Sequence, residues 1–216
     1  MNHTHFIVIS VATTGLVTEN RTPKLLEIAA RHVAPGPPRR STGPGGFVAL
    51  VSHPSVQLCT AEAVQAQRFH GITPELSSTG FPEADVIAAF ALWRRGIVDL
   101  LFDDNRGLAG WRGYNRDFIA AVLSSPGWLE ALGVGASGRC VMEEASEVLG
   151  AHNAVPRLGG SFRFPSLERT ATWLRGRGHP VGLHAKRPGP NARCAAEVCL
   201  ALARERDLLT QQQDAS

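Results

Sequence analysis

The most constraining stretch of the sequence is residues 6–16, FIVISVATTGL, an apolar run that ends in a hydroxyl-rich turn containing a glycine. The first part of this run, residues 6–11, is apolar except for Ser10, and most of its side chains are β-branched or aromatic. A run without polar alternation is typical of a central strand that is covered on both faces. We therefore expect it to form the first strand of a core sheet.

Length and composition favour one globular domain. The chain has 216 residues, of which 44% are hydrophobic and 19% charged, which is enough to bury one sizeable core. We expect a single domain over residues 1–207, a flexible loop over residues 34–46, where APGPPRRSTGPGG cannot sustain regular structure, and a disordered tail over residues 208–216. No apolar stretch approaches the about 20 residues of a membrane span, and residues 6–11 lack the length and basic leader of a secretion signal. A cytoplasmic protein without a membrane partner is predicted.

Charge and cysteine content leave several kinds of partner open. The formal net charge of +3 and the pI of about 8.9 are mildly basic, so contact with phosphate is permitted but not established. The excess of arginine over lysine suits planar phosphate contacts, and it is equally expected from a GC-rich genome. The cysteines have no zinc-ligand spacing, which favours reduced and partly buried thiols: Cys59, Cys140, Cys194 and Cys199.

Hydrophobic periodicity predicts an alternation of strands and helices after the first strand. Three early strands joined by turns indicate an antiparallel start to the fold. Further strands are expected at residues 24–33, 47–52, 107–111 and 138–142. Helices are expected at residues 60–69 with Thr60 as N-cap, and at 82–95, 116–123, 143–149, 166–174 and 191–206 with Asn191 as the last N-cap.

The order of several short motifs resembles that of the DEDDh (DnaQ-like) 3′–5′ exonucleases, from about residue 6 to residue 204. The matching motifs are Thr13-Thr14-Gly15-Leu16, His70-Gly71-Ile72-Thr73, Gly113-Tyr114-Asn115 followed by Phe118, and a late histidine at His184. The resemblance implies an α/β domain of the ribonuclease-H-like fold, with a five-stranded mixed sheet flanked by helices.

The chain departs from the family at the four carboxylate positions that hold its metal ions. Those positions carry Ser10, Ala12, Ile119 and Asn191. Asp117 lies two residues before Ile119, about 200° around a helix at about 100° per residue, so it points away from the ligand position. His184, which matches the family's general base, is separated from Asn191 by two extra residues and by Pro188-Gly189-Pro190, and we expect this insertion to displace it.

These substitutions predict a chain without the family's chemistry. Phosphodiester cleavage in the family uses two divalent ions, which are held chiefly by carboxylate oxygens. A serine hydroxyl and an amide cannot replace four anions, so we expect no magnesium or manganese site and no family-type nuclease activity.

The residues that shape the nucleotide pocket are retained, and fewer carboxylates mean less repulsion of phosphate. We expect the positive charge of the pocket to be supplied by Arg112, Arg116, Lys186, Arg187 and Arg193. The resemblance implies substrate contacts by Thr13, Thr14, Gly15, Leu16, His70, Ile72, Asn115, Arg116 and Phe118.

The leading hypothesis is a catalytically inactive exonuclease homologue that binds nucleic-acid ends or nucleotides, or that presents the fold to a protein partner. One alternative is an active magnesium- or manganese-dependent exonuclease with ligands relocated to Glu19, Glu27 or Asp117. Another is a pocket converted to an unrelated small molecule. A purely structural interpretation also stays open, in which the threonine and glycine turn only closes the strand and the arginines are solvated.

Overall fold

The computed structural model describes residues 5–19, 21–34, 45–54, 58–103, 107–133, 138–159 and 161–214. Most of the loop predicted at residues 34–46 lies outside these ranges.

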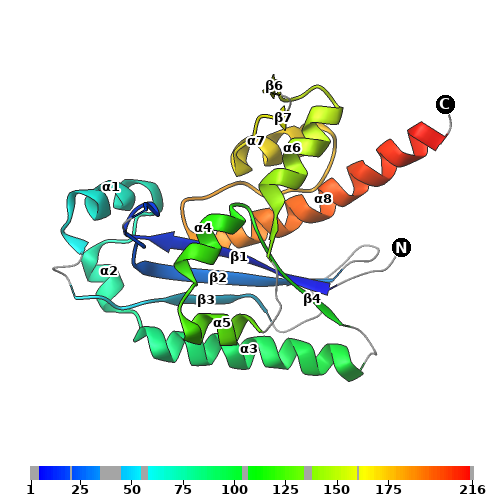
Figure 1. Ribbon diagram of the computed structural model, residues 1–216. Coiled ribbons are helices and arrows are strands. Elements are labelled where there is room, and N and C mark those ends of the chain that lie inside the picture. Colours follow the sequence, from blue (N-terminus) through cyan, green and yellow to red (C-terminus); the bar gives the residue numbers. More distant parts are fainter. Residues whose placement is uncertain are drawn as a thin grey trace.

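The described part of the chain is organised around a five-stranded mixed sheet of order β3-β2-β1-β4-β5 (Figure 1). Strand β1 runs antiparallel to β2 and parallel to β4, β2 pairs antiparallel with β3, and β4 pairs parallel with β5. The first predicted strand is therefore the central one, which confirms the interpretation of its unbroken apolar run. The strands are β1 (His5–Thr13), β2 (Leu25–Val33), β3 (Phe47–Leu50), β4 (Leu108–Gly113) and β5 (Arg139–Cys140).

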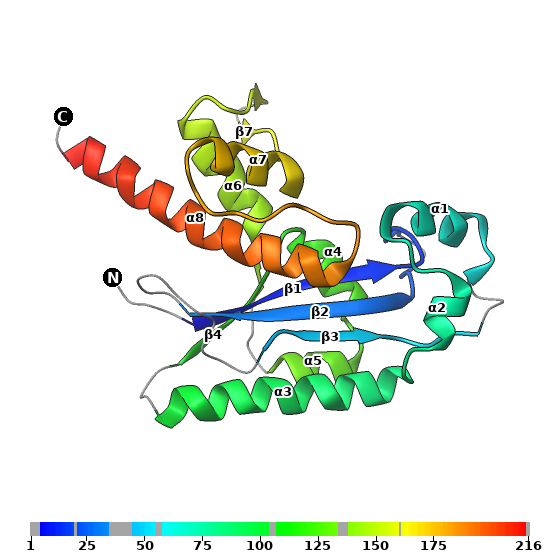
Figure 2. The same cartoon turned by 180° about the vertical axis from the view of Figure 1, so that it is seen from behind.

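Helices cover both faces of the sheet, as the two views in Figures 1 and 2 show. Alternate residues of β1 point to opposite sides, so Phe6 and Val8 enter one buried cluster while Ile7 and Ile9 enter the other. The first cluster is closed by α6 (Val141–Ala151), α7 (Leu167–Gly176) and α8 (Pro188–Asp214). The second is closed by α3 (Glu83–Asp103), α4 (Arg116–Val122) and α5 (Pro126–Leu132).

Two smaller units complete the molecule. Helices α1 (Ala61–His70) and α2 (Pro74–Ser78) lie at the carboxyl end of β1 (Figure 1). Strands β6 (Arg157–Leu158) and β7 (Ser161–Phe162) form a hairpin between α6 and α7.

Two helix caps form side-chain hydrogen bonds, and one of them is the predicted cap Thr60. Thr60 accepts from the backbone N–H of Ala63 at 3.2 Å, and Ser166 accepts from that of Arg169 at 3.2 Å. Both hydroxyls therefore satisfy a backbone donor that the first turn of a helix leaves unpaired.

The predicted cap at Asn191 is wrong, because α8 begins at Pro188. Proline is tolerated in the first turn of a helix, where its missing N–H has no partner to lose. The predicted helix end at residue 206 is also wrong. The helix continues to Asp214, into the predicted tail, because residues 204–213 are mostly strong helix formers.

Helix α3 extends to Asp103, beyond the predicted end at residue 95, because Ile97 and Leu101 continue its buried stripe. The fifth strand is shorter than predicted, and the chain enters α6 directly at Val141. Helices α2 and α5 and the β6–β7 hairpin were not predicted, since segments this short carry little periodicity. None of the helices in the described ranges is long and apolar enough to span a bilayer.

Candidate functional site

A pocket of about 760 Å³ opens where β1 ends, between the turn after β1, helix α1, Phe118 of α4 and the connection between α7 and α8. It brings together residues that are far apart in the sequence. Nine of the positions expected as metal ligands, general base or substrate contacts line it: Ala12, Thr13, Thr14, Gly15, Leu16, His70, Phe118, His184 and Asn191. Five others are not among the lining residues: Ser10, Ile72, Asn115, Arg116 and Ile119.

The turn after β1 is fixed by its two threonines. The hydroxyl of Thr13 donates to the carbonyl of Gly15 at 2.6 Å, and the hydroxyl of Thr14 accepts from the backbone N–H of Lys24 at 2.9 Å. Both threonines are buried, whereas Leu16 is 79% exposed. The hydroxyls therefore hold the turn together, and the turn places the leucine side chain at the rim of the pocket.

His70 joins the end of α1 to the end of β1. Its Nε2 lies 3.1 Å from the carbonyl oxygen of Thr13, and its Nδ1 accepts from the backbone N–H of Ile72 at 3.0 Å. These partners define a neutral ring with the proton on Nε2. Burial lowers the pKa of His70, the hydrogen bond to Thr13 opposes that shift, and the nearby charge of Arg187 adds to it. Both ring nitrogens are thus engaged in holding the pocket wall.

The α7–α8 connection, which carries His184, is held at several points. The backbone N–H of Gly182 donates to the carboxylate of Glu197 at 2.6 Å, and the Lys186 ammonium donates to the carbonyl of Arg68 on α1 at 3.3 Å. The side-chain oxygen of Asn191 accepts from the backbone N–H of Ala185 at 3.1 Å. The amide oxygen of Asn191 therefore already accepts a hydrogen bond from the loop next to His184.

An ion pair between a buried carboxylate and a half-buried guanidinium lies next to the pocket. Glu27 of β2 is the register partner of Ala12 and is 1% exposed, and its carboxylate accepts from the Arg187 Nε at 2.6 Å and also contacts the Arg187 Nη2. Burial raises the pKa of Glu27 and outweighs the lowering effects of Arg187 and of the Gly189 backbone N–H. Glu27 therefore anchors the start of α8 to β2, and neither partner is among the pocket-lining residues.

Among the lining residues that sequence reasoning missed, three have charged or aromatic side chains: Arg21, Glu62 and Phe69. Arg21 and Glu62 form an ion pair at 3.6 Å with both side chains about half exposed. Phe69 is 69% exposed and directly precedes His70. Its position next to the matched motif could have indicated that it lines the pocket. Arg21 reaches the pocket through a turn closed by a bridge between Thr18 and Arg21, which the sequence pattern does not indicate.

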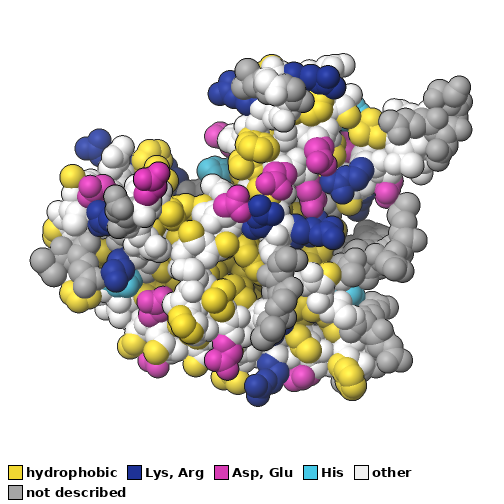
Figure 3. All heavy atoms as spheres, in the orientation of Figure 1, with side chains coloured by type: hydrophobic (Ala, Val, Ile, Leu, Met, Phe, Trp, Pro, Cys, Tyr) yellow, Lys and Arg dark blue, Asp and Glu magenta, His cyan; other side chains and the backbone are white. Residues whose placement is uncertain are grey.

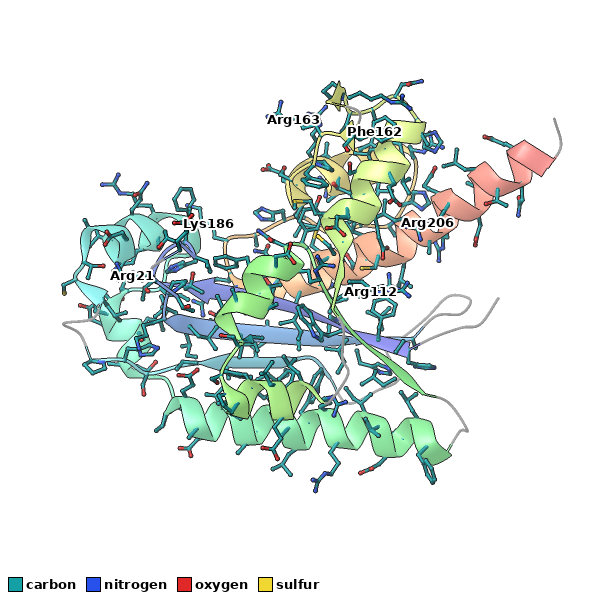
Figure 4. The ribbon with its side chains drawn as sticks, in the orientation of Figure 1. Arg21, Arg112, Phe162, Arg163, Lys186 and Arg206 are labelled. Atoms are coloured by element: carbon teal, nitrogen blue, oxygen red, sulfur yellow. The ribbon has the colours of Figure 1, made fainter. Side chains whose placement is uncertain are left out.

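The predicted arginines have other partners. Arg112 donates to both carboxylate oxygens of Glu144 at 3.0 and 3.1 Å, while Arg193 pairs with Glu197 at 3.0 Å. Of the predicted cations, Lys186 lines the pocket. Figure 4 shows Lys186 and Arg21 at the α1 end of the molecule, away from Arg112.

Helix α4 holds several predicted residues outside the pocket lining. Asn115 caps this helix by accepting from the backbone N–H of Phe118 at 3.3 Å, and Ile119 is buried in the cluster under β4. Arg116 pairs with Asp117 at 2.8 Å and approaches Glu143 at 3.8 Å.

Ser10 and Ile72, the remaining two predicted site residues, also lie outside the pocket lining. Ser10 is half-buried on β1 opposite Ala29, and Ile72 is 1% exposed in the cluster with Ala12.

The relocated ligands considered above do not line the pocket either: Glu19, Glu27 and Asp117. Within the described ranges, no group of three or more His, Cys, Asp and Glu side chains is arranged to hold a metal ion.

The sequence matches no family model and no curated protein, but the structure is similar to those of several exonucleases. The nuclease CRN-4 superposes with a TM-score of 0.62 at 10% identity, over 94% of this chain and 64% of that one. Exonuclease I of E. coli, in complex with a dA16 oligonucleotide, gives a TM-score of 0.57 at 14% identity, over 96% of this chain and 43% of that one. A 3′-exonuclease that recognises the 3′ end of a histone mRNA stem-loop gives 0.51 at 12% identity, over 97% and 84%. The chain therefore has the ribonuclease-H-like fold of the DnaQ-like 3′–5′ exonucleases.

Proposed function

We propose that this chain binds nucleic-acid ends or nucleotides in the pocket at the end of β1, without divalent cations, and does not cleave them as an exonuclease would. The observation that carries the proposal is the composition of the pocket. It retains the turn, His70 and Phe118 around the end of β1, while a methyl group at Ala12 and a committed amide at Asn191 occupy two of the four ligand positions.

The side chains at the four ligand positions do not fit a pair of divalent cations. Ala12 has no donor atom, Ile119 is buried in the core, and the Asn191 oxygen already accepts a hydrogen bond. The hydroxyl of Ser10 is the remaining oxygen, and hard cations in such sites are held chiefly by carboxylates. The buried carboxylate of Glu27, the register partner of Ala12, is paired with Arg187. We therefore derive no step that involves a metal ion.

The pocket supports binding of a nucleotide through its walls and its charge. The exposed side chains of Leu16 and Phe69 offer apolar surface at which a base can stack, and Phe118 lies in the same lining. Lys186 donates to a carbonyl and forms no ion pair in the described part of the chain, so its charge is available to a phosphate. Glu62 is the only acidic residue in the lining, and it pairs with Arg21.

The test is binding of adenosine monophosphate to the full chain by calorimetry in the presence of a chelator. We expect saturable binding that weakens as salt rises, because the phosphate contact is electrostatic. The variant Lys186→Glu reverses the charge that faces the phosphate. We expect it to bind at least about tenfold more weakly, which corresponds to a loss of about 1.4 kcal/mol of binding free energy. The control Arg204→Glu makes an equivalent charge change at an exposed site on α8 that does not line the pocket, and it should bind like the parent.

Two results would contradict this proposal. One is an absence of nucleotide binding at every salt concentration, which would favour a protein-interaction module or a pocket for another small molecule. The other is shortening of a labelled single strand from its 3′ end that requires magnesium or manganese and stops with chelator. That result would establish the alternative of an active exonuclease.

A further inference from the structure

The β6–β7 hairpin is a basic and aromatic surface that the pocket does not use. It lies in the segment 156–164, PRLGGSFRF, between α6 and α7. Arg157, Arg163 and Phe164 are exposed, as is Arg169 in the first turn of α7. None of these three arginines forms an ion pair with a carboxylate within the described ranges. In Figure 3, Lys and Arg side chains flank the top of this hairpin, and Figure 4 shows Arg163 projecting from it.

The hairpin is fixed to α6 through Phe162. The hydroxyl of Ser146 donates to the Phe162 carbonyl at 3.0 Å, and the Phe162 ring lies so close to Gly150 that a Cβ there would overlap it. The guanidinium of Arg157 lies over the ring, 4.9 Å from its centroid. Gly150, Phe162 and Arg157 thus form successive layers, and the exposed Arg157 side chain is held as a flat, charged outer layer.

A hollow of about 610 Å³ adjoins these layers. Its walls include Phe162 and Arg157, and Asn153 contributes the one side-chain amide among the lining residues. Arg169 donates to the carbonyl of Ala154 at 3.0 Å, which holds its guanidinium beside the same wall. The surface therefore combines positive charge, planar groups and a recess.

We propose that this hairpin surface binds single-stranded nucleic acid. Phosphates are contacted by Arg157, Arg163 and Arg169, and bases stack on Phe164 and on the outer face of the Arg157 guanidinium. Arginines without a carboxylate partner, next to an exposed phenylalanine, suit a chain of phosphates and bases, because each base has a face on which it can stack. An acidic peptide would use the charge but would leave the aromatic side chain unused.

The hairpin and the α7–α8 connection lie on the same side of the sheet, as Figure 1 shows. The inference does not depend on the pocket, because the hairpin residues and the pocket-lining residues are separate sets.

The experiment measures binding of fluorescein-labelled oligo(dT) and oligo(U) to the full chain by anisotropy over a series of salt concentrations. The double variant Arg157→Ala/Arg163→Ala removes two phosphate contacts, so the slope of log K against log salt should fall by about 1.4 in magnitude, at about 0.7 per contact for single strands. The variant Phe164→Ala should weaken binding by about fivefold or more, with little change in that slope. The control Arg95→Ala removes an exposed arginine from α3, on the opposite face of the sheet, and should leave both affinity and slope unchanged.

The proposal fails if the double variant binds oligonucleotides as Arg95→Ala does. It also fails if polyglutamate displaces the labelled strand as effectively as unlabelled oligo(dT), since charge alone would then explain binding. The variants change exposed side chains, and a thermal melt of each checks that it is folded. Binding of adenosine monophosphate separates the two proposals. If adenosine monophosphate does not bind, but the hairpin variants still weaken oligonucleotide binding, the pocket proposal fails and the hairpin proposal stands.

Discussion

His70 shows at the residue scale how a motif matched to a nuclease site can be retained for structural reasons. Its ring bonds both the Thr13 carbonyl and the Ile72 amide, and it is 7% exposed. His184 also lines the pocket but is exposed on the α7–α8 connection. The two histidines therefore differ in how strongly the fold depends on them.

We predict that His70→Ala lowers the free energy of unfolding by about 2 kcal/mol, because it leaves a buried carbonyl and a buried N–H without partners. His184→Ala is expected to change it by less than about 0.5 kcal/mol. Urea denaturation of both variants tests this. Equal stabilities would show that the His70 hydrogen bonds are not needed by the fold.

The stacked pair of His5 and His32 predicts how stability depends on pH. The rings of His5 and His32 stack with centroids 5.2 Å apart at the far end of β1 and β2, and both are buried. Burial, with a further contribution from the charge of His5, lowers the pKa of His32 to about 4 from a model-compound value of 6.5. In the unfolded chain His32 takes up a proton as the pH falls through about 6.5, whereas in the folded chain it stays neutral.

Stability is therefore full above about pH 6.5 and is lost as the pH falls toward about 4, by up to about 3 kcal/mol from this group. Urea denaturation at a series of pH values measures the loss. The variant His32→Gln carries no titratable group at this position and should lose correspondingly less over the same range. An identical pH dependence in the variant would contradict the prediction.

The start of α8 is an element whose position depends on one ion pair. Arg187 directly precedes this helix and pairs with Glu27 of β2, so the pair joins the helix to the sheet beside the pocket. Removing one partner of a fully buried pair costs about 3–5 kcal/mol, because the other charge stays buried without compensation. Arg187 is 36% exposed, so a smaller effect is expected.

We predict that Arg187→Ala destabilises the chain by about 2 kcal/mol, which is about half of that range. The matched control is Arg193→Ala on the same helix, whose pair with Glu197 is an exposed i,i+4 pair worth at most about 0.5 kcal/mol. Thermal or urea unfolding compares them. Equal effects would show that Glu27 does not need its partner.

For the molecule as a whole, we propose that the fold of a nuclease is present without its metal-dependent chemistry. A ligand that binds only the folded state raises the melting temperature, by about 2–4 °C for each kcal/mol in a chain of this size. We predict that millimolar manganese leaves the melting temperature of this chain unchanged. The variant Ser10→Asp/Ala12→Glu/Asn191→Asp, which restores three carboxylates, should melt higher with manganese than without it. A manganese-dependent rise in the parent chain would reveal ligands that the proposal does not include.

The apolar run of β1 by itself predicted the central strand, because such a run is stable only when both of its faces are buried. The mixed sheet and the grouping of several motifs were expected from the resemblance of the sequence to the exonuclease family. The sequence also identified which positions carry no carboxylate, since that depends on residue type alone. The tertiary structure decided where polar side chains find their partners. The pairing of Glu27 with Arg187, of Asn191 with Ala185 and of Arg112 with Glu144 joins residues from different elements. Such contacts depend on how elements pack in space, which local periodicity does not encode.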